Sequence, residues 1–251
     1  MAGAALAVIL WVPLLGLRAL ACGVAALAAH EYERIVAIRE ARRREVPLLL
    51  VVALTCWWSS EPVPSHLLLL LLFGLVWVGL DVVVSGVDIG VASARFFGPW
   101  YLGLPLGLLV GVQRMGGARA TLLLLATVVL SDTAQYYSGR AFGRRLLAPA
   151  ISPKKTVEGA IGGLVAGPVL MALAGARLLP GHSRVALAGL GLCLVLLGIG
   201  GDLFESRLKR AAGVKDSSSL IPGHGGVLDR IDALLFVIPP FYLFLRGIGT
   251  L

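Results

Sequence analysis

The chain has 251 residues, of which 58% are hydrophobic and 14% are charged. Soluble globular domains carry about 25% charged residues, so this composition, with a mean hydropathy of +0.90, excludes an ordinary soluble domain and indicates an integral membrane protein. The net charge of +8 follows from an uneven distribution of basic residues between loops, so the composition calls for no nucleic-acid partner.

Apolar segments recur along the whole chain and predict an all-α, polytopic membrane protein with about eight transmembrane helices, within a range of about seven to nine. The first 29 residues lack a basic start and a cleavage site, so they predict one tilted helix or a two-helix hairpin. We expect Pro239 and Pro240 to break or kink the last span. The further spans are predicted near residues 46–58, 66–83, 99–112, 118–139, 157–178, 185–205 and 232–246.

Basic residues are concentrated in alternate loops. The loops at 30–45, 84–98, 140–156 and 206–231 share one predicted side and hold 16 Lys and Arg, against five on the opposite side. The positive-inside rule assigns the richer side to the cytoplasm. We therefore expect one membrane domain over residues 1–251, with N-terminal spans over about 1–112 and a C-terminal half over about 118–251 that carries the polar motifs.

Two aspartates lie inside apolar sequence just ahead of polar loops. Asp132 follows LLLLATVVLS and Asp202 follows LVLLGIGG. An ionised carboxylate at membrane depth costs about 2.5–3.5 kcal/mol on insertion scales, so it persists where it is paired, hydrated or bound to a metal. Both residues are therefore candidate functional residues, and a hydrated position at a helix end is the alternative interpretation of Asp132.

The longest polar stretch adds further acids, bases and glycines. Asp229 and Asp232 are three residues apart, which places both on one face of a helix. Converging carboxylates suit Mg2+, whereas Zn2+ would prefer Cys and His ligands. Acids that hold a cation, bases that hold phosphate oxygens and glycines that let backbone N–H groups approach an anion indicate nucleotidyl or phosphoryl transfer. The bases and glycines of this stretch are Lys209, Arg210, Lys215, Arg230, Gly225 and Gly226, and Lys154 and Lys155 lie on the loop that follows Asp132.

The stretch SRLKRAAGVKDSSSLIPGHGGVLDRID, residues 206–232, resembles position for position the signature of the phosphatidate cytidylyltransferases, or CDP-diacylglycerol synthases. SDT at Ser131 and ISPKKTVEGAIGG at Ile151 extend the resemblance to the C-terminal half. The N-terminal half matches in its hydropathy and in HEYER after the first span. The chain departs from the family at Ala134 and Gln135, where relatives usually have Gly-Ala.

The resemblance implies that CTP and phosphatidate react to give CDP-diacylglycerol and pyrophosphate, with Mg2+ as cofactor, in phospholipid biosynthesis. It implies Asp202 and Asp229 as the principal metal ligands, with Asp232 and Asp132 nearby. It also implies a homodimer and a monovalent cation, K+, beside the Mg2+. We expect the protein in the bacterial cytoplasmic membrane, with its polar site facing the cytoplasm and the lipid substrate entering from the bilayer.

The resulting assignment has three groups of residues. His224 is interpreted as a phosphate donor or a structural hydrogen-bonding group rather than as a base. The catalytic group is Asp202, Asp229, Lys209, Lys215, Asp216 and His224; the substrate-binding group is Lys154, Lys155, Arg210, Gly225, Gly226, Arg230 and Ser206; the metal group is Asp202, Asp229, Asp232 and Asp132.

Two other functions stay open on the sequence. Acids inside a membrane also mark ion pathways, so an ion-coupled transporter is an alternative of a different class. A transporter predicts polar residues through the full depth of the bilayer, whereas here they gather on one side. The second alternative is a CTP-dependent enzyme that acts on another lipid phosphate.

Overall fold

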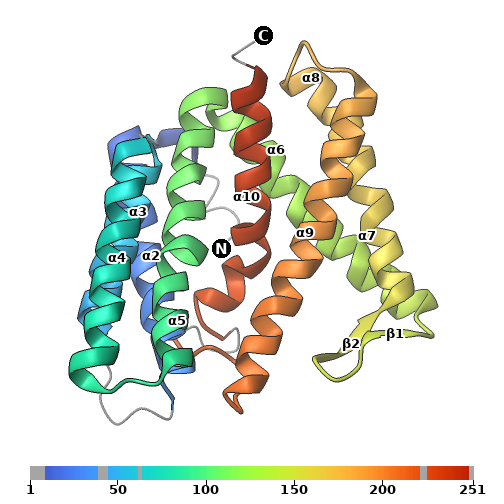
Figure 1. The fold of residues 1–251 in the computed structure, drawn as a ribbon. Coiled ribbons are helices and arrows are strands. Elements are labelled where there is room, and N and C mark those ends of the chain that lie inside the picture. The colour runs from blue at the N-terminus through green and yellow to red at the C-terminus, as the bar shows by residue number, and fades with distance from the viewer. Residues whose placement is uncertain (1–8, 39–44, 62–63, 221–224, 249–251) are drawn as a thin grey trace. The chain divides into compact units, whose positions relative to one another are not determined.

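The computed structural model describes residues 9–38, 45–61, 64–220 and 225–248, and helices make up nearly all of them (Figure 1). This confirms the predicted all-α class. The main helices are α2 (Leu14–Val36), α3 (Glu45–Ser59), α4 (Pro64–Ser85), α5 (Ile89–Gly98), α6 (Leu104–Phe142), α7 (Val157–Leu170), α8 (Ala176–Leu178), α9 (Arg184–Ala211) and α10 (Leu228–Ile248). Two π-helical turns, Pro99–Gly103 and Met171–Gly175, join α5 to α6 and α7 to α8.

The chain forms two compact units, and each is described by itself. The first unit consists of residues 1–11, 112–207 and 232–251, and the second consists of residues 12–111 and 208–231. The first unit therefore holds most of α6, all of α7 and most of α9 and α10. The second unit holds α2 to α5 and the polar segment between α9 and α10.

Five helical stretches in the described part of the chain are long and apolar enough to cross a membrane: Leu14–Val36, Ser65–Ser85, Ile89–Phe142, Val157–Leu178 and Arg184–Ala211. At 1.5 Å per residue the 54-residue stretch Ile89–Phe142 would be about 80 Å long, more than twice the ~30 Å hydrocarbon core. Gly117 breaks the helical dihedral angles inside α6, with φ of +63°. The break falls between the predicted spans at 99–112 and 118–139.

The last apolar segment stays helical through its two prolines. Sequence reasoning predicted a break or a kink at Pro239 and Pro240, and the break is wrong, because α10 runs from Leu228 to Ile248 with both prolines inside it. Each proline removes one backbone hydrogen-bond donor. The neighbouring side chains of Ile238 and Phe241 are fully buried in the first unit, and this packing holds the helix where the backbone ladder is weakened.

Glycines set the distance between helices inside the second unit. A Cβ on Gly103 would lie 3.0 Å from Cβ of Thr55, and a Cβ on Gly107 would collide with the carbonyl oxygen of Cys56. Both neighbours belong to α3, so α3 packs closely against the π-helical turn at Gly103 and against the start of α6 at Gly107. Membrane helices associate through such close packing because lipid offers them no hydrophobic driving force.

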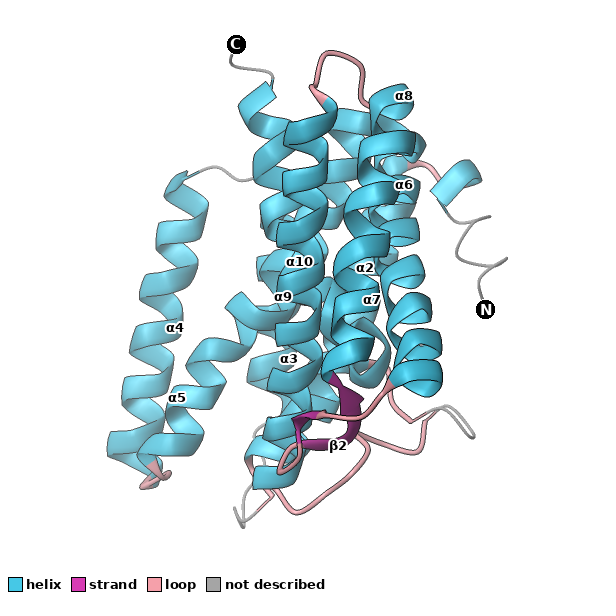
Figure 2. Ribbon diagram, turned by 90° about the vertical axis from the view of Figure 1, so that its right-hand side faces the viewer, coloured by secondary structure: helices cyan, strands magenta, loops and turns pink. Residues whose placement is uncertain are grey.

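A small β-hairpin replaces part of the loop predicted between residues 140 and 156. Strands β1 (Leu146–Ala148) and β2 (Ser152–Thr156) pair antiparallel, with Leu146 opposite Thr156 and Ala148 opposite Ser152. Proline is disfavoured inside a helix because its ring blocks the helical backbone bond, and Pro149 and Pro153 keep this segment extended. The hairpin leaves the end of α6 and leads into α7 (Figure 2).

The contact between α3 and α6 yields a first prediction. Gly107→Ala adds a methyl group against the backbone of Cys56 and is expected to lower the free energy of unfolding by about 1–3 kcal/mol, measured by thermal unfolding in detergent. Gly79→Ala is the matched control, since a Cβ there meets nothing within 4 Å. Equal melting temperatures for the two variants would contradict this account of the contact.

Candidate active site

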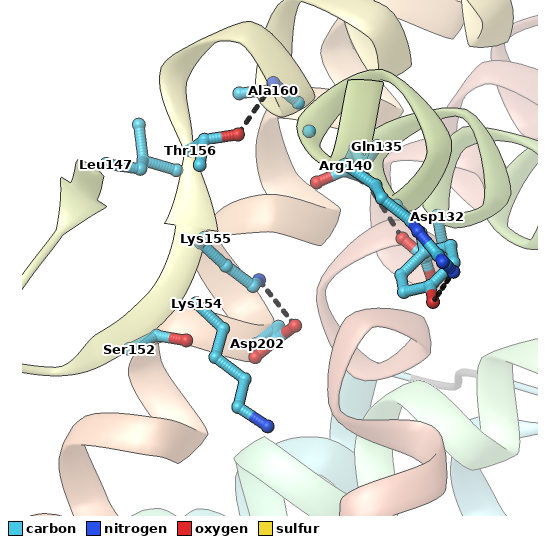
Figure 3. A pocket seen from close by; sticks show the side chains of 13 residues that line it. Asp132, Gln135, Arg140, Leu147, Ser152, Lys154, Lys155, Thr156, Ala160 and Asp202 are labelled. Carbon is cyan, nitrogen blue, oxygen red and sulfur yellow. Dashed lines mark hydrogen bonds and ion pairs between the residues drawn. The ribbon is translucent and has the colours of Figure 1, made fainter. Parts of the chain in front are cut away.

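The first unit contains a cavity of about 590 Å³ that is lined by residues of the SDT and ISPKKTVEGAIGG motifs and by Asp202 (Figure 3). Its wall comes from the end of α6, from the hairpin, from the start of α7 and from α9. The residues that line it are Asp132, Gln135, Tyr136, Gly139, Arg140, Leu147, Ser152, Lys154, Lys155, Thr156, Gly159, Ala160 and Asp202. The cavity therefore brings together four of the predicted site residues, Asp132, Lys154, Lys155 and Asp202.

An ion pair crosses this cavity. The Lys155 ammonium, carried by β2, binds the Asp202 carboxylate on α9 (Figure 3). The Ser206 hydroxyl donates to the other oxygen of Asp202 at 3.3 Å, one helical turn away. Asp202 remains 36% exposed, so the pair keeps contact with the surroundings of the protein and can exchange partners when a ligand enters.

Asp132 faces the same cavity with an amide partner. Its carboxylate accepts a hydrogen bond from the Gln135 side-chain nitrogen at 3.1 Å. Gln135 also packs against α7, where a Cβ on Gly163 would meet its side chain. The residue that departs from the family pattern thus lies in the cavity wall and orients an acid that sequence reasoning selected.

The hairpin that carries the lysines is fixed to the start of α7. The Thr156 hydroxyl caps this helix by accepting the Gly159 N–H at 3.1 Å. The Glu158 carboxylate accepts the backbone N–H groups of Arg144 and Arg145 at 3.0 and 3.2 Å, which ties the base of the hairpin to the same turn. Lys154 and Lys155 are consequently held on a short strand with both ends anchored.

Close approach of two backbones positions the end of α6 beside the start of α7. A Cβ on Gly159 would lie 2.8 Å from the Gln135 carbonyl oxygen and 3.3 Å from the Gly139 Cα. A larger residue at either glycine would push the helices apart and widen the cavity. The glycines of the GRAFG and EGAIGG stretches are therefore explained by this crossing.

The second unit contains a separate polar group centred on Asp229. The Lys209 ammonium binds one oxygen of the Asp229 carboxylate. The other oxygen accepts the N–H groups of Gly226 at 2.7 Å and Ser217 at 3.0 Å, and it lies 2.8 Å from the Ser217 hydroxyl. Lys209 and Asp229 expose 11% and 8% of their side chains, so this pair is shielded from the surroundings.

The partners of Asp229 decide its charge. Burial alone would raise the pKa of this carboxyl, because a low-dielectric environment disfavours the charged form. The Lys209 ammonium and the donors on Gly226 and Ser217 outweigh burial and lower the pKa to about 2. Asp229 is therefore ionised throughout the physiological pH range.

Other predicted residues surround this group less closely. Lys215, Asp216 and Arg230 are exposed, and Arg210 donates to the Val214 carbonyl at 3.2 Å. Gly225 has φ of +78°, and a Cβ there would collide with the Asp229 carboxylate, so the turn requires glycine. His224 lies outside the described residues.

The predicted metal ligands fall into two groups. Asp132 and Asp202 line the cavity of the first unit, whereas Asp229 is bonded within the second unit. Asp232 follows one turn later on α10, where its carboxylate accepts the Ala233 N–H at 2.7 Å. Among the residues that the structure describes, no three His, Cys, Asp or Glu side chains are close enough together to hold a metal ion by themselves.

Sequence reasoning missed two sets of buried charges in the second unit. The Arg95 guanidinium binds Glu33 at 2.6 Å and Asp81 at 2.7 Å, and all three side chains are almost completely buried. Glu31, which is 1% exposed, binds the segment around Ser217 and Leu228. The rule that an acid in an apolar helix needs a partner, applied to Asp132 and Asp202, would have found these acids too.

Comparison with known proteins agrees with the resemblance. The sequence model of the cytidylyltransferase family matches residues 1–248. The phosphatidate cytidylyltransferase of Pseudomonas aeruginosa is 37% identical over 237 residues, which cover 90% of this chain and 86% of that protein. The uncharacterized protein YnbB of Escherichia coli K12 is 44% identical over 147 residues, covering 59% and 47%. The phosphatidate cytidylyltransferase of Haemophilus influenzae is 46% identical over 134 residues, covering 49% and 45%. The chain thus spans about half the length of the last two.

The cap at the base of the hairpin yields a second prediction. Thr156→Ala removes the oxygen that accepts the Gly159 N–H and is expected to cost about 1 kcal/mol of stability, the usual contribution of a helix cap. Thr156→Ser keeps that oxygen and serves as the matched control. Thermal unfolding of the two purified variants measures the difference, and an unchanged melting temperature for Thr156→Ala would show that the cap does not hold the hairpin.

Proposed function

Because the chain belongs to the cytidylyltransferase family, we propose that this membrane enzyme transfers the cytidylyl group of CTP to phosphatidate. An oxygen of the phosphatidate phosphate forms a bond to the α-phosphorus of CTP. The bond between the α- and β-phosphates breaks, and pyrophosphate leaves. The lipid product is CDP-diacylglycerol.

One observation carries the proposal: two lysines and two acids that belong to separate sequence motifs line one cavity. Lys154 and Lys155 come from the hairpin, Asp132 from α6 and Asp202 from α9. Transfer between phosphates needs cations near the transferred group and acids that can hold a further cation. The cavity supplies both sets of charges within the first unit.

The physical difficulty of this reaction is to bring two polyanions together. A phosphate monoester is already an anion at neutral pH, so its attacking oxygen needs little deprotonation. Positioning and neutralisation of charge therefore contribute more than general base catalysis. We assign this work to the ammonium groups of Lys154 and Lys155, which the anchored hairpin holds in place before the substrate arrives.

The acids of the cavity fit the oxygen preference of Mg2+. This ion is commonly held by one or two carboxylates together with substrate phosphates, and Asp132 and Asp202 provide two carboxylates in one cavity. When bound, Mg2+ would neutralise charge on the phosphates of CTP and on the departing pyrophosphate. The Ser206 hydroxyl would keep the Asp202 carboxylate oriented toward the ion.

We propose that the group around Asp229 serves the same reaction. Asp229 is ionised, shielded and bonded to Lys209, and it belongs to the stretch that carries the family resemblance. Lys215 and Arg230 are exposed and lie near it in sequence, and we assign them to binding of phosphate oxygens. Asp229 and Asp232 stay candidate metal ligands. K+ stays the predicted second cation.

The lipid substrate needs no enclosed pocket for its tails, because the acyl chains can remain in the bilayer. Asp132 is exposed and Asp202 is partly exposed, so a headgroup can reach both acids from outside the protein. The positive-inside count supports a cytoplasmic orientation of these residues, in the bacterial inner membrane. A homodimer stays a prediction of the resemblance.

A different lipid phosphate is the second candidate acceptor. Gln135, which stands where relatives usually have alanine, lines the cavity and bonds to Asp132, so the wall of the cavity differs from that of typical relatives. An assay with several lipid phosphates in place of phosphatidate separates the two acceptors. An ion-coupled transporter, by contrast, would release no pyrophosphate from CTP.

The proposed function is tested with purified protein, labelled CTP and phosphatidate in mixed micelles. The wild-type chain is expected to form CDP-diacylglycerol and pyrophosphate in equal amounts. Asp202→Asn and Asp229→Asn each remove a negative charge and are expected to lower kcat at least about a hundredfold, the usual loss of one electrostatic contact in a transition state.

Glu61→Gln is the matched control, because it makes the same change in an exposed acid that pairs with Arg18. Its activity is expected to stay near that of the wild type. Near-normal activity of Asp229→Asn with ample Mg2+ would remove Asp229 from the site. Absence of CDP-lipid with every lipid phosphate would overturn the proposed function.

Removal of the metal gives a further prediction. Chelation of divalent cations with EDTA is expected to abolish formation of the CDP-lipid, and added Mg2+ is expected to restore it, since no protein cation replaces a bridging metal between phosphates. If the enzyme keeps its activity in excess EDTA, the assignment of Mg2+ to Asp132 and Asp202 is wrong.

A further inference from the structure

We propose that Glu31, on the N-terminal helix α2, is a positioning residue that holds Asp229 in place through the polar segment of residues 217–228. Its importance for catalysis rests on the proposed function, whereas its effect on Asp229 does not. Glu31 is 1% exposed and lies near the end of α2, whose other buried residues are mostly apolar. A carboxylate in such surroundings is stable where donors satisfy it.

Glu31 meets this requirement with four donors. One oxygen accepts the Ser218 hydroxyl at 2.6 Å and the Val227 N–H at 3.0 Å. The other oxygen accepts the Ser217 hydroxyl at 2.8 Å and the Leu228 N–H at 2.8 Å. An ionised carboxylate offers about four acceptor positions, so these contacts use its full capacity.

The contacts join the two ends of the polar segment. Each oxygen of Glu31 binds one residue at the start of the segment and one at its end. Val227 and Leu228 also lie at the beginning of α10, where backbone N–H groups have no partner within the helix. Glu31 therefore closes the segment and caps α10, and its negative charge suits the positive end of the helix dipole.

Ser217 links Glu31 to Asp229. Its hydroxyl lies 2.8 Å from a carboxylate oxygen of each acid, and its backbone N–H donates to Asp229 at 3.0 Å. Gly226 adds a second link, because a Cβ there would collide with both Glu31 and the Ser217 hydroxyl, while its N–H donates to Asp229 at 2.7 Å. Release of Glu31 would thus loosen two of the donors that orient Asp229.

The arrangement predicts that an amide cannot replace this carboxylate. In Glu31→Gln one oxygen becomes an NH2 group, which would face a backbone N–H that needs an acceptor and a serine hydroxyl that could accept only by turning its own hydrogen elsewhere. The backbone N–H at that end would be left without a partner, which costs more than the loss of an ordinary hydrogen bond. Asp229 would then hold Lys209 less firmly.

Reactivity of Lys209 reports this effect without any enzyme assay. Purified protein is treated briefly with an amine-acylating reagent, and mass spectrometry gives the ratio of labelling at Lys209 to labelling at Lys215. Lys209 is 9% exposed and paired with Asp229, whereas Lys215 is exposed and serves as the internal reference. Asp229→Asn weakens the Lys209–Asp229 pair directly, so it is expected to give the largest labelling ratio of Lys209 to Lys215.

Glu31→Gln is expected to raise the Lys209 ratio about tenfold, the factor that corresponds to one lost hydrogen bond to a charged group. Ser218→Ala removes one donor of Glu31 and touches no atom of Asp229, so it is expected to raise the ratio in the same direction by less. Arg34→Gln is the matched control, because Arg34 is exposed on the same helix, and its ratio is expected to stay at the wild-type value.

Activity gives the second readout. If Glu31 acts through Asp229, Glu31→Gln lowers kcat with little change in KM for CTP. In a protein that already carries Asp229→Asn, adding Glu31→Gln then lowers kcat only a little further. An unchanged Lys209 ratio in folded Glu31→Gln and in Ser218→Ala overturns the inference. A raised ratio in a chain that forms no CDP-lipid would overturn the proposed function and leave the positioning role of Glu31 intact.

Discussion

Every carboxylate that this protein buries among apolar helices has to be supplied with cations or hydrogen-bond donors, and the positions of those partners determine how the polar segments are held. Arg95 satisfies Glu33 and Asp81, Lys209 pairs with Asp229, and donors on Ser217, Ser218, Val227 and Leu228 satisfy Glu31. Breaking a buried pair by removing one partner typically costs about 3–5 kcal/mol. The acids therefore act as fixed points to which loops are attached.

Glycines complement these fixed points by setting how closely the helices approach. The backbone of α3 touches the π-helical turn at Gly103 and α6 at Gly107, and the backbones of α6 and α7 touch at Gly139 and Gly159 beside the cavity. The hydrogen bonds of Glu158 tie the lysine-bearing hairpin only to the start of α7, so with these bonds alone the hairpin could move together with α7. Close backbone contact holds the base of that hairpin within the small tolerance that phosphate binding requires.

Sequence alone predicted the helical membrane class and selected four of the residues that line the cavity, Asp132, Lys154, Lys155 and Asp202. Asp202 and the Lys154-Lys155 pair could be selected because the signal for each lies in a few neighbouring residues. Asp202 directly follows an apolar run, and the lysines belong to a short motif. The hairpin and the unbroken α10 were missed, because pairing of β1 with β2 and packing around Pro239 depend on contacts that periodicity does not encode. The rule for acids in apolar helices could have selected Glu31, but its partners lie 186 to 197 residues away, so the sequence could not have identified them.

The separation in sequence between Glu31 and its partners also means that they are synthesised at different times. A ribosome adds about 5–20 residues per second, so Glu31 is made roughly 10 to 40 seconds before Ser217, which is 186 residues later. During that interval α2 carries an acid whose permanent donors do not yet exist. The full set of donors to Glu31 exists only once Val227 and Leu228 have been made, so a chain that ends before these residues would lack two of its four donors.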